Sequence, residues 1–361
     1  MKNKYSKQAQ ETGSTLCSFA GYDCIPSELS IYLALKVLNN ESDDNNNNTS
    51  TSTSNHKDSV AKSTTTYRAE TVVRLQGGTA PRGTIRTSIA KMPTMLQFMQ
   101  ELVNYTPPPE RSRTAQSLLL WLLPKWSASL AESEDDRGGG CFTLPHFMGW
   151  CNIPVVHHSF AGQLRSFNDR MVVPMLCSDR WYTGYGLIPI LGLYSLFLLF
   201  VLPVMGCCSV LVVVFPSIAG LVLQLFDSIQ YRGNTKNNRS ALEGSTVDCT
   251  TTVMATDNSA TSAAAVVRFF CRGDAGIICT ALLAAETAFA MLDLDSQNIL
   301  SRGIFGTPAT LVGDRLVERL QHYQHNYNDD RCRLDVQVIR QQQQQDQQQA
   351  AVSSSSPKKV D

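Results

Sequence analysis

The sequence predicts an α+β fold into which an apolar membrane hairpin is inserted. Three observations support this prediction. Residues 16–38 combine a short apolar run, a Gly-led turn and an apolar helical pattern, the order of a strand–turn–helix unit. Residues 266–339 contain further alternating strand and helix patterns. Between these two parts, residues 181–226 include no charged side chain.

The first unit is expected to be a strand over residues 16–20, a turn and a helix. Gly21 permits backbone angles that other residues avoid, and Pro26 has the fixed φ suited to a first helical turn. Apolar residues between Ile31 and Leu38 supply the helix, although residues 31–33 also fit a strand.

Residues 69–76 alternate weakly and are expected to form a strand leading into the turn at Gly77, Gly78 and Thr79. Residues 84–105 have helical apolar spacing with a kink at Pro93. Residues 117–126 are strongly apolar, which fits either a buried segment or a membrane-surface element.

No metal site is expected. The adjacent His157 and His158 are interpreted as strand residues whose side chains point to opposite faces, so they cannot ligate one ion. The eleven cysteines are scattered, odd in number and without zinc spacing, which indicates a reducing compartment.

The C-terminal patterns predict a strand over residues 266–270, a turn, a helix over residues 277–292 and a closing strand over residues 334–339. Glu286 is the only charge on that helix before Asp293. It is a candidate catalytic acid with a raised pKa, and the alternatives are a solvent-facing residue or the partner of a structural Arg. Thr307 and Pro308 are typical of a helix start.

The uncharged residues 181–226 are long enough for two membrane passes or one re-entrant hairpin, because about 20 apolar residues span a bilayer. Pro203 and Gly206 lie near the middle, where a hairpin would turn. Arg180 precedes and Arg232 follows the stretch, and positive charge on both sides favours two cytoplasmic ends. The alternative is a buried helix pair in a soluble core. We predict a membrane-associated hairpin.

The remaining composition excludes one class of partner. The formal net charge is zero and no basic stripe carries interleaved aromatic residues, so nucleic-acid binding is not expected. Residues 39–66, rich in Asn, Ser and Thr, and the Gln/Ser-rich residues 341–361 lack the apolar content for a packed core. Both segments are expected to be disordered.

Three stretches resemble motifs of the saccharopine dehydrogenase-like oxidoreductases, relatives of the trans-acting enoyl reductases. Residues 21–29 (GYDCIPSEL) are similar to the family's G-[FY]-D-[SC]-[IV]-P-[SD]-[DE]-L. Residues 77–84 are similar to its G-G-T-x-S-G-G-T turn, with Pro81 and Arg82 replacing Ser-Gly. Residues 303–310 are similar to its G-G-V-x-T-P-A-x. The three stretches occur in the family's order, and the resemblance extends over roughly residues 16–340.

The resemblance implies that the chain is the C-terminal mixed sheet and helix domain of a Rossmann-type two-domain oxidoreductase. It implies NAD(P) as the cofactor and a lipid-type substrate, such as an enoyl intermediate of glycolipid synthesis. A dinucleotide site needs a Gly-rich turn before a helix, and the first part of this chain has none. NAD(P) is therefore not expected to bind this chain alone. The chain is interpreted as a truncated gene model or as an N-terminally shortened relative of the family.

The candidate cofactor-binding or substrate-binding residues lie on turns at predicted strand ends, where a purely structural role is the alternative: Gly21, Tyr22, Asp23, Gly77, Gly78 and Thr79. Apart from Glu286, the catalytic residues are unknown. The alternative function is a non-catalytic membrane or lipid-droplet-associated module derived from the family.

The predicted domain organisation has six parts: residues 1–38 as the last βα unit of a nucleotide-binding domain, 39–66 as a disordered insert, 67–180 as the first part of the α+β domain, 181–226 as the hairpin, 227–340 as the second part, and 341–361 as a disordered tail. The predicted partners are a membrane or lipid-droplet surface, a lipid-like substrate and a second copy of the chain. The predicted location is the cytoplasmic face of a lipid droplet, the endoplasmic reticulum or a mitochondrion.

Overall fold

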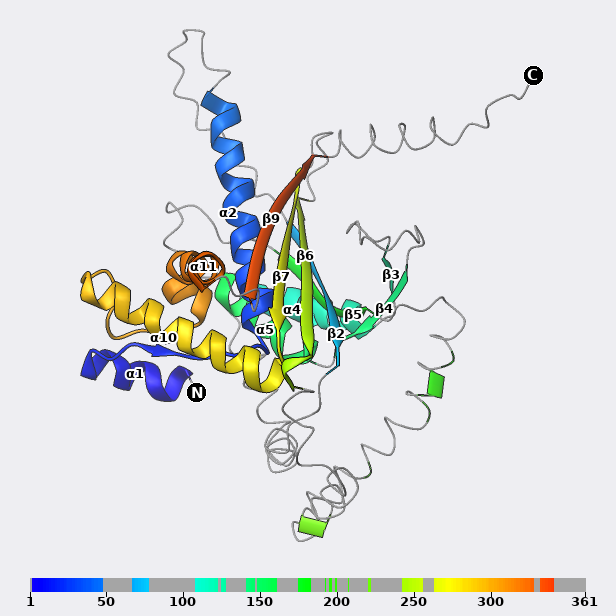
Figure 1. The fold of residues 1–361 in the computed structure, drawn as a ribbon, viewed down its shortest axis with the longest axis horizontal. Helices are drawn as coiled ribbons and strands as arrows, with labels where there is room; N and C mark the ends of the chain where they lie inside the picture. The colour runs from blue at the N-terminus through cyan, green and yellow to red at the C-terminus, as the bar shows by residue number, and fades with distance from the viewer. Residues whose placement is uncertain are drawn as a thin grey trace.

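The computed structural model describes residues 2–47, 67–77, 108–122, 125–127, 141–146, 148–160, 175–182, 242–255, 263–327 and 332–340, with the single residues 192, 195, 196, 199, 207, 220 and 221. This part of the chain is mixed α/β, as the sequence predicts, and comprises two sheets and six α-helices (Figure 1). The predicted hairpin, apart from its first two residues and these single residues, lies outside the described residues. So do residues 84–105 and 341–361.

The larger sheet has seven strands in the order β3-β4-β5-β2-β6-β7-β9. The pair β2–β5 is parallel, and the other neighbouring pairs are antiparallel. The strands are β2 (Tyr67–Gln76), β3 (Lys125–Ser127), β4 (Cys141–Pro145), β5 (Met175–Tyr182), β6 (Thr246–Ala255), β7 (Ala263–Arg272) and β9 (Cys332–Arg340).

Along β6 and β7, one face of the sheet is apolar. Val247, Val267 and Phe269 are buried, whereas Arg268 projects from the opposite face and pairs with Asp248 of β6 at 2.7 Å. Antiparallel sheets commonly pack one face on the core and leave the other polar. The alternating pattern therefore places the core on the α2 side of the sheet.

The helices are α1 (Lys2–Thr12), α2 (Ile25–Asn47), α4 (Pro108–Leu122), α5 (Gly149–Phe160), α10 (Thr280–Ser296) and α11 (Pro308–Tyr327); a π-helix, η2 (Ala275–Cys279), leads into α10. Helix α2 packs on β6, β7 and β9, while α4 and α5 pack on β5. Helix α11 packs on α2 and β9, and α10 packs on α11 (Figure 1).

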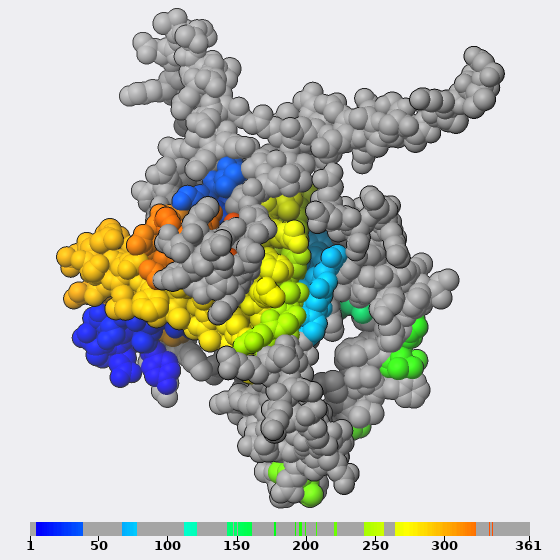
Figure 2. Space-filling view, viewed as in Figure 1, coloured from blue at the N-terminus to red at the C-terminus, as the bar shows by residue number. Residues whose placement is uncertain are grey.

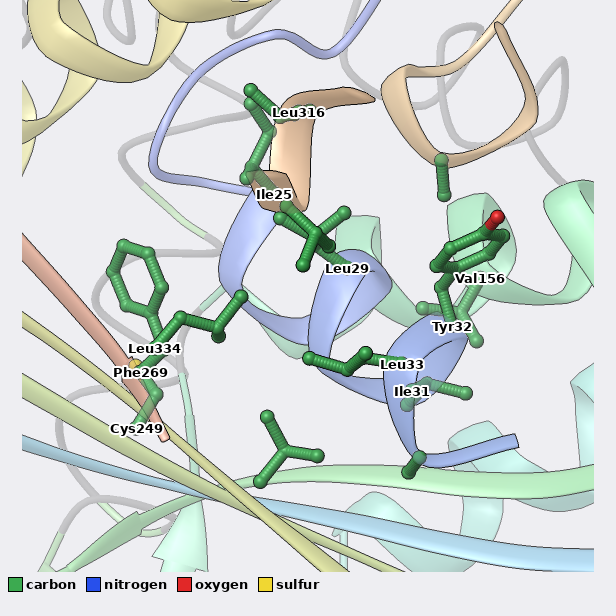
Figure 3. Packing of buried hydrophobic residues seen from close by; sticks show 14 of the residues in the cluster. Ile25, Leu29, Ile31, Tyr32, Leu33, Val156, Cys249, Phe269, Leu316 and Leu334 are labelled. Carbon is green, nitrogen blue, oxygen red and sulfur yellow. The ribbon is translucent and has the colours of Figure 1, made fainter. Parts of the chain in front are cut away.

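Helix α2 is the centre of the core. Its residues from Ile25 to Leu35 are all buried, because the sheet, α5 and α11 surround it. Ile25 and Leu29 lie beside Leu316 of α11, and Leu33 faces the strands (Figure 3). A helix buried on all sides needs no polar face.

A two-stranded parallel sheet joins β1 (Leu16–Cys17) to β8 (Phe305–Gly306). The Leu16 N–H donates to the Ile304 carbonyl at 2.8 Å, and the Ser18 N–H donates to the Gly306 carbonyl at 3.0 Å. The helix that follows β1 is α2, and the helix that follows β8 is α11. Both helices therefore begin at the same edge of this parallel pair.

Most predicted elements in the described part are confirmed, including the helix after Gly21, the strands at β2, β7 and β9, and the helix after Thr307. The predicted strand around His157 and His158 is wrong, because residues 149–160 form α5. The first strand is shorter than predicted and ends at Cys17. Helix α2 continues through residues 39–47 of the insert, since adding residues to a formed helix is easier than starting one. Trp181, where the hairpin was expected to begin, still belongs to β5.

Candidate functional site

The turn at Gly21 joins β1 to α2 and packs against the start of α10. The Ile25 N–H donates to the Gly21 carbonyl at 3.1 Å. A Cβ atom on Gly21 would lie 3.2 Å from the methyl carbon of Thr280, so glycine permits this close approach. The Tyr22 N–H donates to the Thr280 hydroxyl at 3.2 Å. Packing and a hydrogen bond therefore hold the turn on α10.

Gly77 ends β2 with a φ of +71°, a conformation that favours glycine. A Cβ atom there would lie 3.4 Å from Ser245, whose carbonyl accepts a hydrogen bond from the Gly273 N–H at 2.7 Å. Gly273 directly precedes the η2–α10 segment that holds the Gly21 turn. Gly21 therefore contacts this segment directly, at Thr280, whereas Gly77 is linked to it only through Ser245; Gly78 and Thr79 lie outside the described residues.

The helix start that contacts the Gly21 turn is a π-helix. The Asp274 side chain caps it by accepting a hydrogen bond from the Ile277 N–H at 2.9 Å. The Cys279 N–H donates to the Asp274 carbonyl at 3.0 Å, the i→i+5 bond that defines a π-turn. Single π-turns are frequent at functional sites, so the segment strengthens the case for a site here.

A buried polar centre lies behind the Gly21 turn. Glu28, in the first turn of α2, is fully buried, and the Ser159 hydroxyl of α5 donates to its Oε1 at 2.6 Å. The Thr307 hydroxyl, at the start of α11, lies 2.9 Å from the Ser159 hydroxyl. These contacts link three helices through one carboxyl group, and we call Glu28, Ser159 and Thr307 the Glu28 centre.

Burial raises the pKa of Glu28 to about 7. Hydrogen bonds from Ser159 and Thr307 and from the backbone of Ala309 act in the opposite direction, because they stabilise the carboxylate. The start of α11 also favours negative charge. Burial together with the charge of Glu28 raises the pKa of the nearby Cys17 thiol to about 12. Glu28 therefore exchanges its proton close to neutral pH.

Asp23 is the exposed acid of this region. Its pKa is raised because the surrounding protein removes part of its hydration, while His146 acts in the opposite direction. On the preceding segment, Phe19 has a φ of 62°, which is uncommon for a residue with a side chain. Strained backbone is common at ligand sites, so this observation also favours a functional turn.

Glu286 lies elsewhere, in the α10–α11 interface. It is buried, and its Oε2 accepts a hydrogen bond from the Arg319 Nε at 2.8 Å. Arg319 also contacts Asp293 at 2.9 Å and lies over the ring of Phe289, 5.1 Å from its centroid. Glu286 thus has a structural Arg partner, which was one of the alternatives considered from the sequence. A catalytic role for Glu286 stays a prediction.

The two adjacent histidines are buried in α5. The ring Nε2 of His157 lies 3.0 Å from the Ser117 hydroxyl of α4. Burial and the nearby Arg113 lower the pKa of His157 to about 4, so its ring is neutral at physiological pH. Among the described residues, no group of three or more His, Cys, Asp and Glu side chains is arranged to hold a metal ion.

The fold gathers three of the scattered cysteines. Cys271 and Cys332 are direct partners on β7 and β9, and Cys279 of η2 contacts Cys271; all three are buried. The hydrogen bond to Cys271 and burial raise the pKa of both Cys279 and Cys332. The same hydrogen bonds, from Cys279 and Cys332, lower the pKa of Cys271. All three side chains are fully buried, so the cluster belongs to the core.

The sequence reasoning included Glu28 in a motif but did not assign it chemistry. The available signal was a carboxylate in the first turn of a helix whose neighbours, such as Ile25, Leu29 and Ile31, are apolar. Its partners Ser159 and Thr307 carried no comparable signal. Thr307 was predicted only as a helix start, a role it also has, because the Leu311 N–H donates to its carbonyl at 3.0 Å.

The two helix starts do not fit the pyrophosphate of a dinucleotide. The Gly21 turn offers a single glycine, and that glycine is packed against Thr280. At the start of α11, the carboxyl group of Glu28 takes the place of an anion. A Cβ atom on Gly306 would lie 2.8 Å from Leu311 and Thr310, so this turn is closed by its own helix. Neither described helix start leaves backbone N–H groups open to a phosphate.

Among the described residues, one helical segment, Ala275–Ser296, is long and apolar enough to cross a membrane. Length and composition alone do not separate such a helix from a core helix of a soluble protein. The segment lies outside the predicted hairpin.

Comparisons of the chain with protein-family models, with curated proteins and with solved structures found no match.

Proposed function

We propose that this chain is the substrate-side α+β part of a saccharopine dehydrogenase-like, NAD(P)-dependent oxidoreductase that acts on a lipid-type substrate. One observation carries the proposal: α2 and α11 begin at the carboxyl ends of two parallel strands, and the Glu28 centre links them there. In open α/β folds, ligands bind outside the carboxyl ends of parallel strands. Groups that titrate near neutral pH also cluster at functional sites.

The residues of the Gly21 turn have distinct roles in this proposal. Asp23 is exposed and has a raised pKa, so it suits proton transfer to or from a bound substrate. Glu28 is fully buried and positions the turn from behind. Tyr22 is buried and joins the turn to α10 through its backbone.

NAD(P) supplies the hydride when it is bound. Because the starts of α2 and α11 do not fit its pyrophosphate, we propose that residues outside the described part, or a second polypeptide, hold the cofactor. The residues of the Gly21 turn would then orient the substrate, and Asp23 would transfer the proton.

A binding measurement tests the enzymatic proposal. If residues of this chain outside the described part hold the cofactor, NADPH should quench the tryptophan fluorescence of the purified, detergent-solubilised chain below about 1 mM, the upper end of common KM values. Asp23→Asn is expected to retain this quenching but to lose oxidation of NADPH in the presence of a membrane lipid extract. Asp314→Asn, an exposed acid at the Lys36 ion pair, is the matched control. No quenching by NADPH or NADH would refute a stand-alone enzyme.

We further propose that residues 181–226 hold the protein at the cytoplasmic face of a membrane or on a lipid-droplet surface. The support is their lack of charged residues and the positive residues on both sides. Alkaline carbonate removes peripheral proteins but leaves inserted hairpins in the membrane pellet. Release of the chain into the supernatant would refute the inserted hairpin.

A non-catalytic membrane or lipid-droplet module derived from the same family is the second candidate. The observation that favours it is the closure of both helix starts by internal contacts. This candidate predicts carbonate resistance together with no response to either nicotinamide nucleotide. The enzymatic proposal predicts carbonate resistance with a response.

A further inference from the structure

Large apolar side chains are exposed along one side of α10 and the segments that adjoin it. Ile277 is 44% exposed and Leu292 is 62% exposed. Between them, the exposed residues in line with both are Ala281, Ala284, Ala285 and Ala288. We call these six residues, Ile277 of η2 and five residues of α10, the outer face of α10. Figure 2 shows α10 in yellow at the molecular surface.

The opposite side of α10 holds two of its three acidic residues. Glu286 and Asp293 pair with Arg319 of α11, and Asp293 also pairs with Arg315. These ion pairs fix α10 on the protein, so the helix is not free to cross a membrane. The outer face is left as an apolar surface of the kind that marks an interaction site.

We propose that the outer face of α10 pairs antiparallel with the outer face of a second copy of this chain, forming a two-fold homodimer.

The order of residues on the outer face supports a second copy as the partner. A large residue lies at each end and alanines lie between them, so the order of large and small residues is the same from either end. Pairing about a two-fold axis between Ala284 and Ala285 places Ile277 of one copy opposite Leu292 of the other. It also places Ala281 opposite Ala288. The large residues then meet at the two ends and the small residues at the centre, where the helices can approach to about 8 Å. Such self-complementarity is what a two-fold interface requires.

The charges at the two ends of α10 are also complementary. Arg272 ends β7 three residues before η2 begins, is exposed and has no ion pair with the described residues. Asp295 lies in the last turn, is exposed and pairs with Arg302 of its own copy at 3.2 Å. An antiparallel pair brings the Arg272 end of each copy toward the Asp295 end of the other. A parallel pair would instead place like charges together.

Neighbouring exposed residues extend the surface. Phe289 lies on α10 and Ile299 lies just beyond its end; they are 49% and 63% exposed. Stable interfaces bury at least about 1,200 Å² in total, more than two alanine-rich helix faces provide alone. The interface therefore includes this apolar rim.

The oligomeric mass tests the proposal directly. We expect the full chain in mild detergent to have twice its protomer mass of 39.8 kDa by light scattering, after correction for detergent. Ala285→Arg at the two-fold axis is expected to halve this mass. Ala115→Arg, the same change at an exposed position of α4, is expected to leave it unchanged.

A charge exchange tests the antiparallel register. Ile277→Lys and Leu292→Glu should each give monomers, because each copy buries a charge opposite an apolar residue. The double variant should restore the dimer, since Lys at 277 of one copy then faces Glu at 292 of the other. Circular dichroism confirms that each variant is folded.

Two outcomes would overturn the proposal. One is a monomeric wild-type chain whose outer face is needed only for binding to phosphatidylcholine vesicles, which would assign the face to lipid. The other is a dimer that Ala285→Arg leaves intact, which would place the interface elsewhere.

Discussion

Glu28→Gln is the sharpest test of the Glu28 centre. The substitution keeps the shape of the side chain and removes its ionisation. We expect the free energy of unfolding of the wild type to fall between about pH 5 and about pH 8, whereas that of Glu28→Gln changes much less. The two proteins should differ most at the alkaline end.

The magnitude follows from the pKa of Glu28. The pKa is about 7 in the folded protein and has the ordinary value of 4.5 in a free chain. This difference corresponds to about 3 kcal/mol. Because the folded state retains the proton to higher pH, the stabilisation is complete below the ordinary value and is lost as the pH rises through about 7. Above that pH the wild type buries a charge that Glu28→Gln does not have.

Urea unfolding at several pH values, followed by circular dichroism in mild detergent, measures the difference. Other groups, including Asp23, titrate in both proteins and cancel in the comparison. Glu11→Gln, an exposed change on α1, controls for the loss of one surface carboxylate. Parallel pH profiles of the wild type and Glu28→Gln would show that the carboxyl group is not held as the structure indicates.

Three further mutational tests have definite expected outcomes. Ser159→Ala removes the 2.6 Å hydrogen bond to the buried carboxylate, so it should cost about 1–3 kcal/mol in urea unfolding and raise that carboxyl group's pKa further. Arg319→Met should cost more than Glu286→Gln, because it also breaks the contacts with Asp293 and the Phe289 ring; a double-mutant cycle measures the coupling. Gly313→Ala should cost about 1–3 kcal/mol in thermal unfolding, because its Cβ would lie 2.7 Å from the Tyr32 ring, and Tyr32→Leu should relieve much of this cost.

Elements with a local signal were predictable from the sequence. The strand β7 and the turn after it follow from an apolar run and Gly273. The start of α11 follows from Thr307 and Pro308, and its buried Leu316 and Leu320 lie at helical spacing. In each case the determining residues are close together in the chain, so periodicity and capping chemistry suffice.

The course of residues 149–160 was not predictable in this way. The run Pro154, Val155 and Val156 favours a strand by propensity, yet it forms the middle of α5. Residues 151–160 are all buried. Packing against α2, α4 and β5 therefore decides the conformation, and tertiary contacts commonly override such weak preferences.

The chemistry of the site depends on contacts that no local pattern reports. Glu28 and Ser159 are 131 positions apart, and Ser159 and Thr307 are 148 positions apart. Glu286 and Arg319 also meet only when α10 packs on α11. A sequence motif shows where an acid lies but not which groups surround it, and those surroundings determine its pKa.

Helix α10 connects the proposed site with the proposed dimer. Thr280 in its first turn contacts Gly21 and Tyr22, while its outer face carries the predicted two-fold axis. A helix held on both sides loses less order at its start than one held on α11 alone, so we expect dimer formation to stabilise the Gly21 turn. Amide hydrogen exchange of Tyr22 in Ala285→Arg tests this coupling. Faster exchange of the Tyr22 N–H than in Ala115→Arg would support the coupling, and equal exchange would show that the site and the interface are independent.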